Sequence, residues 1–118
     1  MLLDSHCNLK IADFGVAALL AGDDKKGFFT KRVGTDYCMA PELFASQEYN
    51  GVEVDLFASA VTLFTMVAGI RPFKNCTKSD QHYSLIMDKN PARFWRKHAI
   101  NTKKVFSEDF KNLITSML

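Results

Sequence analysis

The stretch that decides the fold lies between two short signatures: residues 13–15 read DFG, and residues 34–42 read GTDYCMAPE. Between them, residues 20–35 contain glycines, aspartates and lysines without a usable hydrophobic period. A loop of this length is uncommon inside a compact domain and usually serves a function, so we predict a long functional loop. Pro41 is tolerated in a first helical turn and should open a short helix where the loop ends.

Upstream of the loop, two short apolar runs predict a β-hairpin. Residues 2–4 (LLD) and 9–12 (LKIA) flank residues 5–8 (SHCN), which favour turns. Short apolar runs bounded by turn formers are typical of paired strands. We therefore expect hairpin strands within residues 1–12, followed by the loop segment of residues 13–42.

Downstream, residues 55–68 predict a buried helix, because they are apolar on nearly every face and such a helix must be surrounded by protein. Gly69 is a plausible end for this helix, and Pro72 prevents its continuation. The most apolar run, residues 54–70, carries Asp55 near its start and falls short of the ~20 residues that a bilayer span requires. We therefore predict no membrane contact.

Two further helices are expected towards the C-terminal end. Ser79 or Asp80 can cap a short helix that runs through Met87. Ser107 is a good N-cap, followed by two acidic residues that suit a first helical turn. The last helix has a helical stripe of apolar residues: Phe110, Leu113, Ile114, Met117 and Leu118. The expected fold class is mainly α with a short N-terminal β-hairpin.

Composition indicates one globular domain or part of one. The chain has 118 residues, 47% of them hydrophobic and 24% charged, and its net charge of +2 selects no partner class. Basic residues and a histidine cluster near the C-terminal end: Arg93, Arg96, Lys97, His98, Lys103 and Lys104. Such a cluster can mark nucleic-acid or acidic-membrane contact, but no nucleic-acid motif accompanies it, so a solvated loop flank is preferred. Phe94-Trp95 is either a docking surface or part of a loop between helices with one anchoring indole, and we prefer the loop.

Cysteine usage indicates a reducing compartment. Cys7, Cys38 and Cys76 form an odd, widely spaced set without a CxxC pair, so neither a disulfide framework nor a zinc site is expected. The first residues lack the charged, apolar and small-residue order of a secretory signal. We expect an intracellular, cytoplasmic location.

The order of DFG, Gly34-Thr35 and Ala40-Pro41-Glu42 resembles the serine/threonine protein kinase family, whose activation segment runs from DFG to APE. Residues 34–42 are similar to the family pattern GTxxYxAPE. The resemblance implies the helical C-terminal lobe of the kinase α+β fold, with residues 1–12 as hairpin strands, 13–42 as activation segment and 43–118 as helical lobe. It covers the whole chain and about half of a kinase domain.

The resemblance also assigns ligands to the N-terminal residues. Asp13 matches the aspartate that holds Mg²⁺ on the phosphates of ATP; read alone, it is a turn aspartate. Leu2 would line the adenine floor and Ala12 would precede the metal loop, although both can equally be hairpin core residues. Phe14 matches the phenylalanine whose packing separates active from inactive arrangements, and Gly15 would let the backbone pivot.

Within the activation segment and beyond it, the resemblance implies substrate-binding and structural roles. Thr35 and Tyr37 would belong to the loop that receives a protein substrate, and the Gly-Thr pair favours serine or threonine as acceptor. Glu42 would pair with a buried arginine and so fix the loop. Asp55 would begin the central helix and accept backbone hydrogen bonds from the catalytic loop, or act simply as an N-terminal helix carboxylate. Thr30 is a possible phosphosite, although an unmodified loop threonine is an equal alternative.

The 118 residues hold no glycine-rich phosphate loop, VAIK-type lysine or HRDLxxxxN catalytic loop. By family, we expect a kinase that transfers the γ-phosphoryl of ATP to protein Ser or Thr hydroxyls, with ATP and Mg²⁺ as cofactors and no nucleic-acid partner. We expect the chain to be inactive alone and of marginal stability, since both ends would cut through a cooperative unit. One alternative is a noncatalytic, pseudokinase-like module that binds a partner through residues 79–104; another is an unrelated small helical protein.

Overall fold

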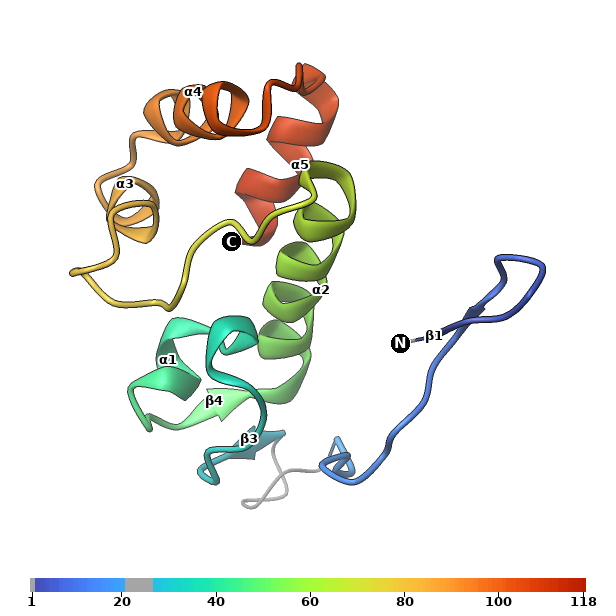
Figure 1. Cartoon of the computed structure of the whole chain (residues 1–118). Helices are drawn as coiled ribbons and strands as arrows, with labels where there is room; N and C mark the ends of the chain where they lie inside the picture. Colours follow the sequence, from blue (N-terminus) through green and yellow to red (C-terminus); the bar gives the residue numbers. More distant parts are fainter. Residues whose placement is uncertain (1, 21–26) are drawn as a thin grey trace.

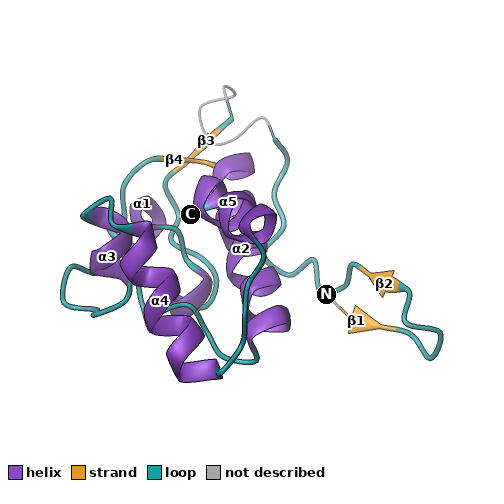
Figure 2. Ribbon diagram, turned by 90° about the horizontal axis from the view of Figure 1, so that it is seen from above, coloured by secondary structure: helices purple, strands orange, loops and turns teal. Residues whose placement is uncertain are grey.

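The computed structural model describes residues 2–20 and 27–118, so part of the predicted loop, residues 21–26, lies outside the described residues. The described chain is mainly helical and carries two small antiparallel sheets (Figures 1 and 2). The predicted fold class, mainly α with an N-terminal β-hairpin, is confirmed. The longest helix, α2 (Gly51–Ala68), stands beside α5 (Glu108–Met117), and the other helices lie on the same side of α2 as α5 (Figure 1).

The N-terminal hairpin pairs β1 (Leu2–Leu3) with β2 (Leu9–Lys10), as the apolar runs predict. Its turn is held by Asp4, whose Oδ1 accepts hydrogen bonds from the backbone N–H groups of His6 and Asn8, both at 2.9 Å. These contacts satisfy backbone N–H groups within the turn and so stabilise the chain reversal. The hairpin stands apart from the helical body in both views, and its leucines are exposed (Figures 1 and 2).

A second sheet, which the sequence did not predict, pairs β3 (Phe28–Phe29) with β4 (Tyr49–Asn50). The rings of Phe29 and Tyr49 stack with centroids 5.7 Å apart, and the Tyr49 hydroxyl donates to the Lys31 carbonyl at 2.8 Å. A Cβ on Gly51 would lie 2.8 Å from the Phe29 ring, so only glycine fits this approach. The end of the long loop is thereby fastened to the start of α2.

Helix α2 begins at Gly51, four residues before the predicted start at Asp55, because Asn50 caps it. The Asn50 side chain accepts from the backbone N–H groups of Val52 and Glu53 at 2.9 and 3.4 Å. Gly69 ends the helix in the left-handed conformation at φ 77°, as predicted.

A helix as apolar as α2 is expected to be surrounded by protein, but the described residues cover only part of it. Its buried residues are Phe57, Ala60, Val61, Phe64 and Ala68, whereas Val52, Leu56 and Met66 are exposed. The other described elements cover one face only. By length and composition alone α2 is also a candidate membrane span, a weak indication because core helices pass the same test.

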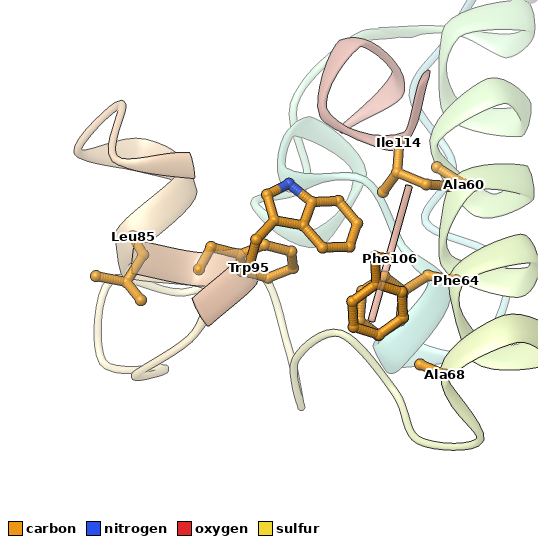
Figure 3. Close-up of a cluster of buried hydrophobic side chains, with 8 residues drawn as sticks. Ala60, Phe64, Ala68, Leu85, Trp95, Phe106 and Ile114 are labelled. Carbon is orange, nitrogen blue, oxygen red and sulfur yellow. The ribbon is translucent and has the colours of Figure 1, made fainter. Parts of the chain in front are cut away.

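The main core lies between α2, α5 and α4 (Pro91–Thr102), as Figure 3 shows. The interpretation of Phe94-Trp95 as part of a loop is wrong, because both residues lie in α4 and are buried. The Trp95 indole N–H donates to Thr115 Oγ1 at 3.0 Å, so the buried polar group is satisfied. The predicted cap of α5 is confirmed, since Ser107 Oγ accepts from the Phe110 N–H at 3.3 Å.

A second cluster joins the predicted helix at Pro41, α1 (Pro41–Phe44), to the chain that follows α2. Its buried residues are Ala40, Phe57, Val61, Phe73, Cys76 and Tyr83. The short helix α3 (Tyr83–Met87) begins later than predicted, and Asp80 rather than Ser79 supports it, because Asp80 Oδ1 accepts from the His82 and Tyr83 N–H groups.

Candidate functional site

A cavity of about 450 Å³ gathers residues from three separate segments of the chain. Asp13 and Phe14 come from the DFG triplet, Gly34 and Thr35 from the far end of the loop, and Asp55 from the second turn of α2. Apolar residues complete the wall, including Ile11, Phe29, Val33, Met39, Leu43 and Val54. The fold therefore brings four of the predicted site residues, Asp13, Phe14, Thr35 and Asp55, to one concave surface.

Asp13 adopts a left-handed backbone at φ 66°, unusual for a residue other than glycine. Its Oδ1 accepts a hydrogen bond from the Gly15 N–H at 3.2 Å, which supports this turn. Asparagine and aspartate tolerate the left-handed region better than other residues because their side chains bond locally. The turn leaves the carboxylate exposed at the cavity.

This carboxylate suits Mg²⁺ as one member of a ligand set that substrate oxygens complete. Mg²⁺ is usually held in phosphoryl-transfer sites by one or two carboxylates together with phosphate oxygens and waters. No group of three or more His, Cys, Asp or Glu side chains that could cage a metal occurs among residues 2–20 and 27–118. A single exposed aspartate therefore fits a metal site that phosphate oxygens and waters complete, and does not fit a site formed by protein side chains alone.

The other residues of the DFG turn differ in part from expectation. The left-handed conformation falls at Asp13, and Gly15 has no positive φ. A Cβ on Gly15 would lie 3.2 Å from Asp13 Oδ1, so a side chain there would crowd the carboxylate in this position. The Phe14 ring is 70% exposed and lies at the mouth of the cavity without a packed partner in the core.

The two residues predicted to contact adenine do not belong to this cavity. Leu2 lies in β1 with an exposed side chain, and Ala12 is half-buried between the hairpin and Asp13. Neither residue is part of the cavity wall. No adenine slot is thus formed around them by the described residues.

The Gly34-Thr35 signature leads into a 3-10 turn, η1 (Asp36–Cys38). The Thr35 carbonyl accepts from the Cys38 N–H at 2.8 Å, and the Thr35 side chain stays on the cavity wall. Counting from Gly34, Cys38 and not Tyr37 occupies the tyrosine position of GTxxYxAPE, which corrects the motif comparison. Cys38 packs against the second core cluster, and burial raises the pKa of its thiol.

Tyr37 makes a contact that could not be predicted from the sequence alone. The Arg71 guanidinium lies over the Tyr37 ring at 3.8 Å from its centroid, within cation–π range. Arg71 follows the end of α2, so the contact joins the loop predicted to receive substrate to the segment after α2. An arginine before a proline is too common a pattern to have indicated this pairing from sequence.

Glu42 is a half-buried carboxylate without an ion pair among the described residues. It lies near the Cys76 thiol and the Tyr83 phenol. Burial is the main cause that raises the pKa of Cys76 and of Tyr83 to about 12, and the negative charge of Glu42 contributes to both. A half-buried carboxylate of this kind is suited to a cationic partner such as arginine.

Thr30 lies directly after β3 and is exposed. Arg32, two residues further on, donates through Nη2 to Asp36 Oδ1 at 2.9 Å and lies over the Phe44 ring at 4.9 Å. Both Arg32 and Asp36 are exposed, so this ion pair contributes little to stability. Arg32 can therefore leave Asp36 and pair with another acidic group.

Asp55 lies one turn inside α2 and not at its start, because Gly51 opens the helix. Its backbone carbonyl accepts from Ser59 Oγ at 2.8 Å, while its carboxylate faces the cavity with the wall residues Val54 and Ala58. The carboxylate makes no ion pair among the described residues. It is thus available to accept hydrogen bonds from a segment placed in the cavity.

Comparison with known proteins agrees with the order of these elements. A family model described as "Protein kinase domain" matches residues 1–118. CBL-interacting protein kinase 11 of Oryza sativa subsp. japonica is 31% identical over 121 residues, which covers 100% of this chain and 22% of that protein. CBL-interacting protein kinase 25 of the same plant is 30% identical over 118 residues, covering 100% of this chain and 21% of that protein.

An Arabidopsis thaliana relative, CBL-interacting serine/threonine-protein kinase 15, is 39% identical over 75 residues, 64% of this chain and 18% of that protein. The chain thus spans about a fifth of the length of the curated relatives it matches. The family model covers every residue, and the DFG, Gly-Thr and APE signatures occur in the family order. The chain belongs to the eukaryotic serine/threonine protein kinase family.

Proposed function

We propose that this chain supplies the activation segment and part of the helical lobe of an enzyme that transfers the γ-phosphoryl of ATP to Ser or Thr hydroxyls of proteins. One observation carries the proposal: a single cavity gathers Asp13, Thr35 and Asp55 from three segments. A turn aspartate, a loop threonine and a helix carboxylate have no reason to converge in an unrelated helical protein. In a kinase they surround the catalytic loop.

The chemistry assigns distinct tasks to these residues. Bound Mg²⁺ neutralises charge on the β- and γ-phosphates, and Asp13 is the residue that would hold it. The acceptor hydroxyl oxygen forms a bond to the γ-phosphorus while the bond to the β–γ bridging oxygen breaks and ADP departs. Thr35, on the cavity wall, would position the substrate side of the site, and Asp55 would hold the backbone of the loop that carries the base.

The base itself is the reason we propose that the chain is inactive alone. Kinases take the hydroxyl proton with the aspartate of an HRD catalytic loop, and no such motif occurs in these residues. The cavity of about 450 Å³ has room for a short backbone segment between Asp13 and Asp55. We place that loop there. A protein substrate, ATP and a cytoplasmic location complete the proposal; nucleic acid and membrane are not part of it.

The test is a phosphoryl-transfer assay on the native protein that contains these residues. Asp13→Asn should abolish transfer from ATP to a Ser/Thr peptide, because the amide cannot neutralise the metal as a carboxylate does. Asp109→Asn, an exposed carboxylate in the first turn of α5, is the matched control and should leave activity unchanged. Full activity in Asp13→Asn would refute the metal role.

A noncatalytic, pseudokinase-like interaction module remains the second candidate. The exposed cations of α4, within the region 79–104, favour it. The same assay separates the two candidates, since a module without catalysis would show no transfer in the unmodified native protein.

A further inference from the structure

A groove of about 710 Å³ between α4 and α5 lies outside the cavity described above. Trp95 and Phe106 line it, and both are buried in the main core. Ala92 and Ala99 stand one turn to either side of Trp95 on the same face of α4, and their short side chains leave the groove open. Val105 completes the apolar surface and is 99% exposed.

The charge at this groove is mainly positive. All charged residues between positions 89 and 107 are Lys or Arg, and Arg96 and Lys104 lie on the groove wall. The acidic residue on the wall, Glu108, is paired with Lys111 at 2.7 Å. Arg96 makes no ion pair among residues 2–20 and 27–118. The Lys104 side chain is oriented by a hydrogen bond, because its Nζ donates to the Val67 carbonyl at the end of α2 at 2.6 Å.

We propose that this groove binds an acidic peptide segment of another protein, with an apolar side chain inserted over Trp95. Helix α4 lines the groove from Pro91 to Ala99, so the groove is about 13 Å long, the span of about four extended residues. The acidic residues of the peptide would face Arg96 and Lys104, and its apolar residue would cover Val105. An apolar centre with a charged rim is the usual anatomy of a specific protein interface.

A peptide fits these features better than nucleic acid does. Single-stranded nucleic acid binds by stacking its bases on exposed aromatic faces. Trp95 and Phe106 line the groove but are each only 5% exposed, so little ring surface is available for stacking. Aliphatic contact with Val105, Ala92 and Ala99 selects an aliphatic or aromatic side chain instead.

The experiment titrates the native protein that contains these residues into a short fluorescein-labelled peptide in which glutamates flank a central leucine-phenylalanine pair. Anisotropy reports affinity, and the groove variants described below report whether the peptide occupies the groove. We expect saturable binding and a weaker affinity at higher salt. A peptide with lysines in place of the glutamates should not bind.

Three variants locate the site. Arg96→Glu and Val105→Glu should each weaken binding about five- to tenfold, because each places a like charge against the peptide. Val105 is 99% exposed, so Val105→Glu should leave the fold intact. This variant therefore tests the groove even if Arg96→Glu unfolds the protein. Lys78→Glu makes the same charge change at an exposed position outside the groove and should have no effect.

Three results would overturn the inference. The first is no saturable binding to the unmodified protein when circular dichroism shows it folded. The second is equal affinity for the unmodified protein, Arg96→Glu and Val105→Glu. The third is full displacement of the peptide by single-stranded RNA of matched charge, which would identify a general polyanion surface. None of these measurements uses phosphoryl transfer, so they stand or fall independently of the proposed activity.

Discussion

Lowering the pH should destabilise the helical body through one side chain, His98. This residue lies in α4, is 1% exposed, and its ring contacts Phe64 and Phe94 at centroid distances of 4.8 and 4.5 Å. Neither ring nitrogen makes a hydrogen bond to a described residue. The His82 ring lies 4.7 Å away. A proton on His98 would therefore be a poorly solvated charge beside a second imidazole.

The magnitude follows from the pKa. Burial, with a smaller contribution from His82, lowers the pKa of His98 from 6.5 to about 4; Lys97 adds to the shift, while the Pro72 carbonyl and Asp80 oppose it. Between these values the unfolded chain binds a proton that the folded chain excludes. Stability is therefore fully present above pH 6.5 and is lost as the pH falls towards 4. One pKa unit corresponds to about 1.4 kcal/mol, so the loss reaches up to about 3 kcal/mol.

The assay is urea unfolding followed by Trp95 emission at pH 7.5 and at pH 4.5. Carboxylates also titrate in this range, so the informative quantity is the difference between the unmodified chain and His98→Leu, which removes the titrating ring. The free energy of unfolding of the unmodified chain should fall by about 2 to 3 kcal/mol more than that of the variant. Equal losses in the two proteins would refute the assignment of the pH dependence to His98.

Three further predictions concern stability and modification. Phe64→Ala should cost about 3 to 5 kcal/mol of unfolding free energy, because Phe64 is fully buried, whereas the exposed Met66→Ala on the same helix should cost little; chemical denaturation compares them. Peptide mapping of the native protein should find phosphate at Thr30 and none after Thr30→Ala; unchanged phosphate in that peptide would exclude this site. The isolated chain should aggregate as its concentration rises, because apolar residues of the hairpin, the DFG turn and α2 are exposed together; light scattering over a concentration series tests this, and a monomer that stays soluble throughout the series would contradict it.

The parts of the fold that local chemistry determines could be predicted from the sequence. Turn formers at residues 5–8 indicated the hairpin, Pro41 opened α1, and Ser107 capped α5. Helix α4 was not predicted, because its basic residues were interpreted as a solvated loop flank. Asn90 before Pro91 is nevertheless a strong start signal for a helix. The Asn90 side chain accepts from the Arg93 N–H at 3.2 Å, with proline in the first turn.

Contacts between distant segments could not be predicted in this way. The β3–β4 pair joins two strands of two residues each. Strands this short cannot show the alternation of apolar and polar residues from which a strand is predicted. The motifs indicated which residues matter at the candidate site, but the cavity that gathers Asp13, Thr35 and Asp55 depends on how the loop returns to α2. The cation–π contact of Arg71 with Tyr37 is of the same kind.

The β3–β4 fastening makes the loop and the cavity thermodynamically linked. Phe29 and Tyr49 stack on each other, and both residues line the cavity. Thr30 follows Phe29 directly, so a modification that favours or opposes the strand pair changes the free energy of the cavity wall. Linkage is reciprocal: a segment that binds more tightly to the paired arrangement must stabilise the pair by the same factor. If Thr30 is modified, the two short strands would couple that modification to the binding of a segment beside Asp13.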